Sequence, residues 1–209
     1  MPKLLIATHN AGKIRDFKAI LVPLGYEVVS GSDLGLPEPD ESEVTFVGNA
    51  RIKAYAAAKA TGIEAISDDS GIEIAILGGA PGVLTADWSF DGNGGRDTGL
   101  ALQRMQREIS SAGGVMPQLA RICCALVMAR PDGTDDIFVA NISGHIVWPP
   151  RGDHGFGFDP VFVPDGETRT LAEMTPDVKS RFSHRGQATR MLLDHLALRD
   201  TVMTPQLQP

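Results

Sequence analysis

The sequence lacks most of the features that would mark a membrane, secreted or nucleic-acid-binding protein. No run approaches the ~20 apolar residues that a transmembrane helix needs, and the apolar stretch after Lys3 is too short for a signal peptide. Only 19 lysines and arginines oppose 26 aspartates and glutamates, which leaves a net charge of −7. An acidic chain is poorly suited to neutralising nucleic-acid phosphates. We therefore expect a cytoplasmic protein that binds neither a membrane nor a nucleic acid.

Cysteine is also scarce, because the chain has two, Cys123 and Cys124, and they are adjacent within an apolar run. Neighbouring side chains of a strand point to opposite faces, so these two thiols cannot readily bond to each other. We expect them to be reduced and buried, as free cysteines commonly are, rather than to serve metal or redox chemistry.

The spacing of apolar residues and of glycine and proline predicts a mixture of helices and strands in one domain spanning residues 1–209. Strands are expected at residues 4–7, 27–30, 65–67, 72–77, 121–129, 137–148 and 158–163. Helices are expected at residues 14–24, 45–60, 96–109 and 186–196. Residues 68–71 are expected to form a polar turn, and residues after 198 a frayed tail. The mixture favours an α/β or α+β fold with an elongated mixed sheet.

The first candidate for chemistry is the loop Thr8-His9-Asn10-Ala11-Gly12-Lys13, which follows a buried strand and opens a helix. The N-terminus of a helix favours anions, and Thr8, Asn10 and Lys13 add a hydroxyl, an amide and an ammonium group. The glycine spacing is not that of a Walker A loop. The segment is equally well explained as a phosphate-binding loop or as a helix cap with a solvated lysine.

A second candidate is the pair of carboxylates Asp68 and Asp69, which interrupts an apolar run and precedes Ser70 and Gly71. Two carboxylates at a strand end suit a divalent cation and a general base. An ordinary polar turn is the alternative. The apolar residues on both sides favour the functional interpretation.

Glu41 precedes a helix on which Asn49 and Lys53 are four residues apart and therefore share a face. On its own, this segment is better explained as an acidic loop followed by an amphipathic helix.

The C-terminal third supplies candidates for binding an aromatic base. Glycines flank Phe156, which could stack on a purine, whereas Phe158 is expected in the core. Ser183 could cap the last helix, which would put the cations of His184 and Arg185 in its first turn. That placement opposes the helix dipole unless an anion or acceptor is bound, so it hints at function.

Taken together, these segments resemble the inosine/xanthosine triphosphate pyrophosphatase family. Six matching segments occur in the family's order and span nearly the whole chain: Ala7-Thr8-His9-Asn10-Ala11-Gly12-Lys13, Thr45-Phe46-Val47-Gly48-Asn49-Ala50 with Lys53-Ala54, Ser67-Asp68-Asp69-Ser70-Gly71-Ile72-Glu73, Gly79-Ala80-Pro81-Gly82-Val83, Gly155-Phe156-Gly157-Phe158-Asp159-Pro160 and Ser183-His184-Arg185-Gly186-Gln187-Ala188.

The resemblance implies an elongated mixed sheet flanked by helices, with two lobes around a central substrate cleft, in a homodimer. It implies hydrolysis of ITP, dITP, XTP and dXTP to the monophosphate and pyrophosphate with the help of Mg²⁺, which would cleanse the nucleotide pool. Asp69 would be the catalytic base, and Glu41, Asp68 or Asp69 would bind the metal.

The remaining roles that the resemblance implies concern the substrate. Thr8, Asn10, Lys13 and Lys53 would hold the triphosphate, Phe156 would stack on the purine, and Lys179, His184 and Arg185 would bind the base and its 6-keto edge. The full set implied to bind substrate is Thr8, His9, Asn10, Ala11, Gly12, Lys13, Lys53, Ser70, Gly155, Phe156, Gly157, Phe158, Asp159, Lys179, His184 and Arg185.

The chain departs from the family pattern at two positions. Asp87 stands where an arginine is frequent, and His154 where a glycine is frequent. Neither belongs to the implied catalytic set, but both bear on specificity and assembly. Two alternatives stay open, namely a pyrophosphatase for pyrimidine or modified-base triphosphates on a similar scaffold, and a nucleotide sensor without catalytic activity.

Overall fold

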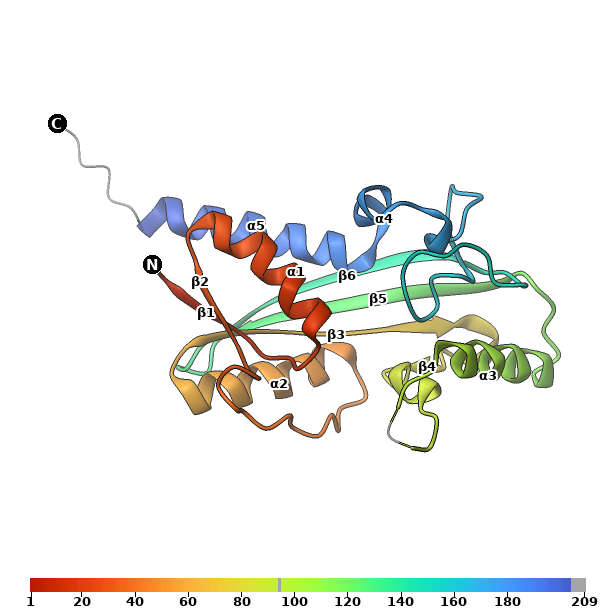
Figure 1. Cartoon of the computed structure of the whole chain (residues 1–209), viewed down its shortest axis with the longest axis horizontal. Helices are drawn as coiled ribbons and strands as arrows, with labels where there is room; N and C mark the ends of the chain where they lie inside the picture. Colours follow the sequence, from red (N-terminus) through yellow and green to blue (C-terminus); the bar gives the residue numbers. More distant parts are fainter. Residues whose placement is uncertain (94, 204–209) are drawn as a thin grey trace. The chain divides into compact units, whose positions relative to one another are not determined.

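The computed structural model describes residues 1–93 and 95–203, and it divides into two compact units (Figure 1). The first unit comprises residues 1–71 and 124–139, and the second comprises residues 72–123 and 140 onward. The strands are β1 (Lys3–Ile6), β2 (Glu27–Ser30), β3 (Glu64–Ile74), β4 (Pro81–Gly82), β5 (Gln118–Ala129), β6 (Asp135–Ile146) and β7 (Phe162–Pro164). The helices are α1 (Ala11–Leu21), α2 (Phe46–Thr61), α3 (Thr98–Ser111), α4 (Pro176–Phe182) and α5 (His184–Met203), with short 3₁₀ helices η1 (Val22–Leu24), η2 (Ala75–Leu77), η3 (Ala86–Ser89) and η4 (Leu171–Glu173).

The strands form one seven-stranded sheet in the order β2-β1-β3-β5-β6-β7, with β4 paired to β3. Strand β1 is parallel to both β2 and β3, whereas β4 and β7 are antiparallel to their neighbours. The expected mixed sheet flanked by helices is therefore confirmed.

The first unit alternates strictly between strands and helices from β1 to β3. Strand β2 lies on one side of β1 and β3 on the other, so the chain reverses its direction across the sheet at β1. Right-handed crossovers in opposite directions put α1 and α2 on opposite faces, as Figure 1 shows. Ligands of open α/β sheets bind at such a reversal, outside the carboxyl ends of the strands. The carboxyl end of β1 and the adjacent part of β3 are therefore the expected position of a site.

Local sequence signals define both helices of this unit. The side chain of Asn10 caps α1, and Thr45 caps α2, accepting a hydrogen bond from the Gly48 N–H at 3.0 Å. Gly62 ends α2 in the left-handed conformation, with φ 69°. The alanines of α2 are small enough to let the helix pack closely on the sheet, and they form a core cluster with Leu5 and Val127.

The second unit has its own core, to which Phe158 contributes with an exposed fraction of 8%, as the sequence predicted. Apolar residues of α3 fill the same core, among them Leu102, Met105 and Ile109. Strands β5 and β6 are neighbours joined by a tight turn, in which the Arg130 N–H donates to the Thr134 carbonyl at 2.8 Å. The strands expected at 121–129 and 137–148 are therefore neighbours in the sheet.

Four sequence predictions about boundaries were wrong. The strand expected at 72–77 ends at Ile74, because residues 75–77 form η2. Residues 68–71 are not a turn, because β3 continues through them to Ile74, and their polar groups find partners within the first unit. The strand expected at 158–163 is β7 (Phe162–Pro164), because residues 155–161 form turns instead. The helix does not end at 198 but continues as α5 to Met203, since no proline or glycine occurs between residues 187 and 203.

Cys123 and Cys124 are both buried thiols that form no disulfide, as expected. Within the described ranges, no helix is both long enough and apolar enough to span a membrane.

Candidate active site

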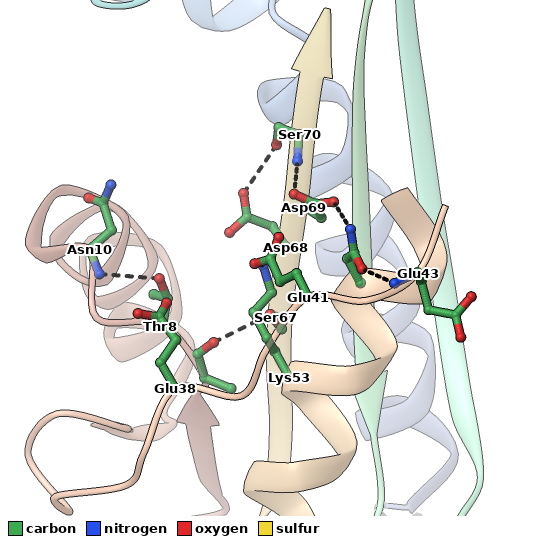
Figure 2. A network of polar contacts seen from close by, with 12 residues as sticks. Thr8, Asn10, Glu38, Glu41, Glu43, Lys53, Ser67, Asp68, Asp69 and Ser70 are labelled. Atoms are coloured by element: carbon green, nitrogen blue, oxygen red, sulfur yellow. Dashed lines mark hydrogen bonds and ion pairs between the residues drawn. The ribbon is translucent and has the colours of Figure 1, made fainter. Parts of the chain in front are cut away.

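The loop after β1 is organised by Asn10, whose side-chain Oδ1 accepts the Gly12 and Lys13 N–H groups at 3.0 and 3.2 Å. The Asn10 N–H itself donates to Thr8 Oγ1 at 3.2 Å. The expected helix cap is therefore present, and Thr8 lies beside it at the carboxyl end of β1 (Figure 2).

Lys13 projects from α1 to strand β3, where its Nζ lies 2.8 Å from Oδ1 of Asp68. The Asp68 side chain is only 1% exposed, so it depends on this cation and on Ser70, whose hydroxyl donates to Oδ2 at 3.2 Å. A carboxylate can remain charged in a buried strand when it is paired in this way.

On the other face of β3, helix α2 supplies Asn49 and Lys53, which share a helix face as the sequence predicted. Both side chains are buried. Lys53 Nζ lies 2.5 Å from Glu41 Oε1, and Asn49 Nδ2 lies 3.4 Å from Asp69 Oδ2. The Asn49 Oδ1 atom accepts the Glu43 N–H at 2.9 Å. Helix α2 therefore joins the acidic segment before it to the carboxylate of Asp69.

Asp69 has the environment of a general base. Its pKa is raised to about 6, chiefly by burial and also by the charge of Glu41, against the opposing effect of the Lys53 ammonium. Hydrogen bonds from Asn49 and from the Ser70 N–H, at 2.9 Å, favour the charged form. A carboxylate whose pKa lies near neutral pH is best suited to taking a proton from water.

Asp68 and Asp69 are consecutive in a strand, so their side chains point to opposite faces of β3, as Figure 2 shows. Among the described residues, no group of three or more histidine, cysteine, aspartate or glutamate side chains is arranged to hold a metal ion. Mg²⁺ commonly uses only one or two carboxylates and completes its shell with water and substrate phosphate oxygens. Asp69 and Glu41, which interact electrostatically, meet that requirement.

A small pocket of about 70 Å³ opens beside this network, entirely within the first unit. Its polar lining comes from Thr8, His9, Glu38 and Lys53, and the ring Nδ1 of His9 lies 4.0 Å from Glu38 Oε2. The rest of the wall is formed by small or apolar residues, namely Ala7, Gly31, Leu36, Pro37, Pro39, Ala56, Ala57 and Ala60.

The second unit contains a different group of predicted residues, gathered around an exposed aromatic ring. Phe156 is 66% exposed, and Lys179 Nζ and Arg185 Cζ lie 5.1 and 5.8 Å from the centroid of its ring. An exposed ring flanked by cations offers a stacking face together with hydrogen-bond donors at its edge. Phe158 is buried in the core and offers no such face.

Asp159 holds this group together, because its Oδ2 atom accepts the Phe156 N–H at 2.7 Å and lies 2.6 Å from Lys179 Nζ. Gly155 makes the arrangement possible. Its φ is +86°, and a Cβ atom there would lie 2.2 Å from Asp159 Oδ2.

Ser183 caps α5 as predicted, since its hydroxyl accepts the Gly186 N–H at 3.0 Å. His184 and Arg185 consequently occupy the first turn, half-buried. Of the two departures from the family pattern, Asp87 is exposed in η3, and His154 is exposed in the loop before Gly155.

The structure thus brings the predicted residues together in two groups. Lys13, Lys53, Glu41, Asp68 and Asp69 gather with Thr8 and Ser70 in the first unit, and Phe156, Asp159, Lys179 and Arg185 gather in the second. Sequence reasoning placed Asn49 on the face of Lys53 but assigned it no role. Its contact with Asp69 joins positions 20 residues apart and has no local signal.

Comparison with known proteins shows the family to which the chain belongs. The model of the Ham1 family matches residues 4–195. A protein of Ruegeria pomeroyi named dITP/XTP pyrophosphatase is 53% identical over 185 residues, which cover 88% of this chain and 90% of that protein. A protein of the same name from Brucella melitensis is 46% identical over 202 residues, covering 92% of each chain.

Solved structures show the same fold. A HAM1 protein from Coxiella burnetii superposes with a TM-score of 0.87 at 32% identity, covering 94% of this chain and 99% of the other. A nucleoside-triphosphatase, also named dITP/XTP pyrophosphatase, from Mycobacterium abscessus gives a TM-score of 0.74 at 35% identity, covering 91% and 98%. The chain that carries this pair of residue groups is therefore a member of the Ham1 family.

Proposed function

We propose that this protein hydrolyses non-standard purine nucleoside triphosphates, namely ITP, dITP, XTP and dXTP, to the monophosphate and pyrophosphate. The observation that carries the proposal is the position of Asp69, a buried carboxylate with a pKa raised to about 6 that lies beside Lys53 of α2. Its neighbour in the strand, Asp68, pairs with Lys13 of α1. The names of relatives that are 53% and 46% identical over most of the chain support the choice of substrate.

Asp69 is the group that takes the proton from the attacking water. The water attacks the α-phosphorus in line with the departing pyrophosphate, and its proton passes to a carboxylate oxygen of Asp69. The hydrogen bonds from Asn49 and the Ser70 N–H fix the direction of that carboxylate. Its pKa of about 6 keeps it mostly ionised at neutral pH.

Lys13 and Lys53 bind the phosphates. Each is now paired with a carboxylate, Lys13 with Asp68 and Lys53 with Glu41. A triphosphate carries about four negative charges and competes well for both cations. Thr8, next to the cap of α1, adds a hydroxyl donor near the same helix N-terminus. The lysines thereby stabilise the charge that develops on the departing pyrophosphate.

Mg²⁺ would be held by Asp69 with Glu41, whose oxygen atoms are the ligand type that this ion prefers. When bound, it supplies charge neutralisation for the triphosphate and the pyrophosphate.

The second group of residues selects the base. The exposed ring of Phe156 stacks on the purine, and Lys179, His184 and Arg185 aim donors at a 6-keto oxygen. Hypoxanthine and xanthine satisfy these donors, whereas the 6-amino group of adenine leaves them without an acceptor. Asp159 fixes Lys179 and the backbone of Phe156 in place.

A panel of triphosphates with Mg²⁺ tests the proposal, with pyrophosphate, orthophosphate and monophosphate each measured. We expect kcat/KM for ITP, dITP and XTP to exceed that for ATP by about 100-fold or more, with pyrophosphate as the inorganic product. Comparable values for ATP and ITP, or release of orthophosphate, would contradict it.

The same panel decides between the proposal and its alternatives. Preference for a pyrimidine or a modified base would indicate a related pyrophosphatase of different specificity, and binding without turnover would indicate a sensor. We further propose that the enzyme works as a homodimer in the cytoplasm, where nucleoside triphosphates are made and where its action would cleanse the nucleotide pool.

A further inference from the structure

Three residues of α2 hold the irregular segment of residues 41–43 that precedes the helix. Lys53 pairs with Glu41 at 2.5 Å, and the Oδ1 atom of Asn49 accepts the Glu43 N–H at 2.9 Å. Gly48 contributes by lacking a side chain, since a Cβ atom there would lie 2.6 Å from Glu43 Cβ. The segment is therefore tied to the helix along its length.

Asn49 also connects this segment to strand β3. Its Oδ1 atom is committed to the Glu43 N–H, so its amino group faces Asp69, with Nδ2 at 3.4 Å from Oδ2. In the opposite orientation of the amide, the Asn49 amino group would face the Glu43 N–H, and its carbonyl oxygen would face the Asp69 carboxylate, so neither hydrogen bond could form. Asn49 is only 2% exposed, so water cannot readily replace either bond.

Gly48 supports this interpretation independently. Glycine is among the least favourable residues in a helix, and this one lies inside α2. The close approach of the Glu43 side chain gives it a packing reason, because any other residue would push the segment away from the helix.

We propose that Asn49 is a positioning residue that locks the segment of residues 41–43 to Asp69. Together with Gly48, it fixes the carboxylates of Glu41 and Asp69 relative to each other. The inference rests on the proposed function, since it assigns Asn49 a part in the hydrolysis that Asp69 carries out. Asn49 acts through Asp69 and Glu41 rather than by touching the substrate.

The test compares the variants Asn49→Ala and Gly48→Ala with the wild-type chain, using ITP with Mg²⁺ and amide hydrogen exchange resolved at Glu43. We expect both variants to lower kcat by at least about tenfold, while KM stays within about threefold because the phosphate and base ligands are untouched. Exchange of the Glu43 amide should be about tenfold faster in both. Gly48→Ala is the sharper variant, since alanine favours the helix and should not lower its stability through propensity.

Asn49→Asp separates the two sides of the contact. Its carboxylate can still accept the Glu43 N–H but cannot donate to Asp69. We expect exchange at Glu43 close to that of the wild type and a loss of kcat similar to that of Asn49→Ala. Wild-type kcat in Asn49→Asp would show that the bond to Asp69 has no such role.

Thr61→Ala is the control for a general weakening of α2. The Thr61 hydroxyl donates to the Ala57 carbonyl at 2.8 Å at the far end of the same helix. This variant should lower the Tm while kcat and exchange at Glu43 stay within about twofold of the wild type.

The proposal is overturned if Asn49→Ala keeps kcat within about twofold, or loses kcat while the Glu43 amide exchanges at the wild-type rate. If the wild-type chain does not hydrolyse ITP, the proposed function fails. In that case, exchange of the Glu43 amide in Asn49→Ala alone decides whether Asn49 holds the segment. Exchange at the wild-type rate would show that it does not.

Discussion

Lys13 of helix α1 places its Nζ atom 2.8 Å from Oδ1 of Asp68 in strand β3, and this pair joins a helix to a buried strand. Because the Asp68 side chain is only 1% exposed, loss of the cation leaves a buried carboxylate without its counter-charge. We expect Lys13→Met to lower the free energy of unfolding by about 2 kcal/mol, measured by urea denaturation at neutral pH.

The double variant Lys13→Met/Asp68→Asn is the control for this prediction. Neutralising Asp68 removes the cause of the penalty, so the double variant should recover most of the lost stability. The single variant Asp68→Asn completes the comparison. If the losses of Lys13→Met and Asp68→Asn simply add in the double variant, the ion pair does not stabilise the fold.

Asp69→Asn tests the assignment of the base. We expect kcat for ITP to fall by at least about 1000-fold, since the amide cannot take the proton from the attacking water. KM should change little, because the lysines and the aromatic face remain. Activity within a few-fold of the wild type would show that Asp69 is not the base.

The raised pKa of Asp69 also predicts a dependence of stability on pH. The folded state holds the Asp69 proton up to a pH of about 6, whereas an unfolded chain releases it near pH 4. Folding therefore becomes less favourable as the pH rises between these values, by up to about 3 kcal/mol at neutral pH.

Asp69→Asn has no such titration, so its stability relative to the wild type should increase from pH 4 to pH 7. Urea denaturation of both chains across this range, with EDTA to remove cations, measures the difference. An asparagine at position 69 has one carbonyl oxygen for the two donors, Asn49 and the Ser70 N–H, so the substitution also removes a hydrogen bond. The test therefore uses the change in the stability difference with pH and not its size at a single pH. A constant difference across the range would contradict the raised pKa.

The sequence predicted what depends on neighbouring residues. A cap in the loop before α1 and a cap at Ser183 could be predicted because a capping side chain binds N–H groups two or three residues away. Helix α2 likewise follows from the local spacing of its residues, and the burial of Phe158 follows from its apolar side chain.

The continuation of β3 through Asp68 and Asp69 could not be predicted in the same way. Two adjacent carboxylates indicate a turn unless partners are present, and these partners, Lys13 and Asn49, come from two different helices. The alternation of a strand sends the two side chains to opposite faces, so each meets its own helix. Contacts of this kind are fixed by the topology of the sheet and leave no local mark in the sequence.

Phe156 and Phe158 lie two residues apart, but alanine should affect substrate binding at Phe156 and the stability of the fold at Phe158. Phe156 is 66% exposed, so Phe156→Ala should change the free energy of unfolding by less than about 0.5 kcal/mol. Loss of stacking should raise KM for ITP by about tenfold. Phe158→Ala should cost about 3–5 kcal/mol because it leaves a cavity in the core. An unchanged KM in Phe156→Ala would exclude the stacking role.

Gly155 and Gly157 form the second matched pair, because both have positive φ, +86° and +60°, but only Gly155 lies against other atoms. Alanine at either position should lower the free energy of unfolding by about 1–2 kcal/mol because of the left-handed backbone conformation alone. At Gly155 the new Cβ would also lie 2.2 Å from Asp159 Oδ2 and 3.0 Å from Lys179 Nζ, whereas nothing lies within 4 Å of the Cβ at Gly157.

The difference between these two variants therefore isolates the pair of Asp159 and Lys179. We expect Gly155→Ala to be less stable than Gly157→Ala by a further ~1–3 kcal/mol in urea denaturation. It should also raise KM for ITP by more than about tenfold, because displaced Lys179 and Phe156 no longer meet the base together. Gly157→Ala should keep a KM near that of the wild type. Equal effects of the two substitutions on KM would mean that Asp159 does not position Lys179 for the substrate.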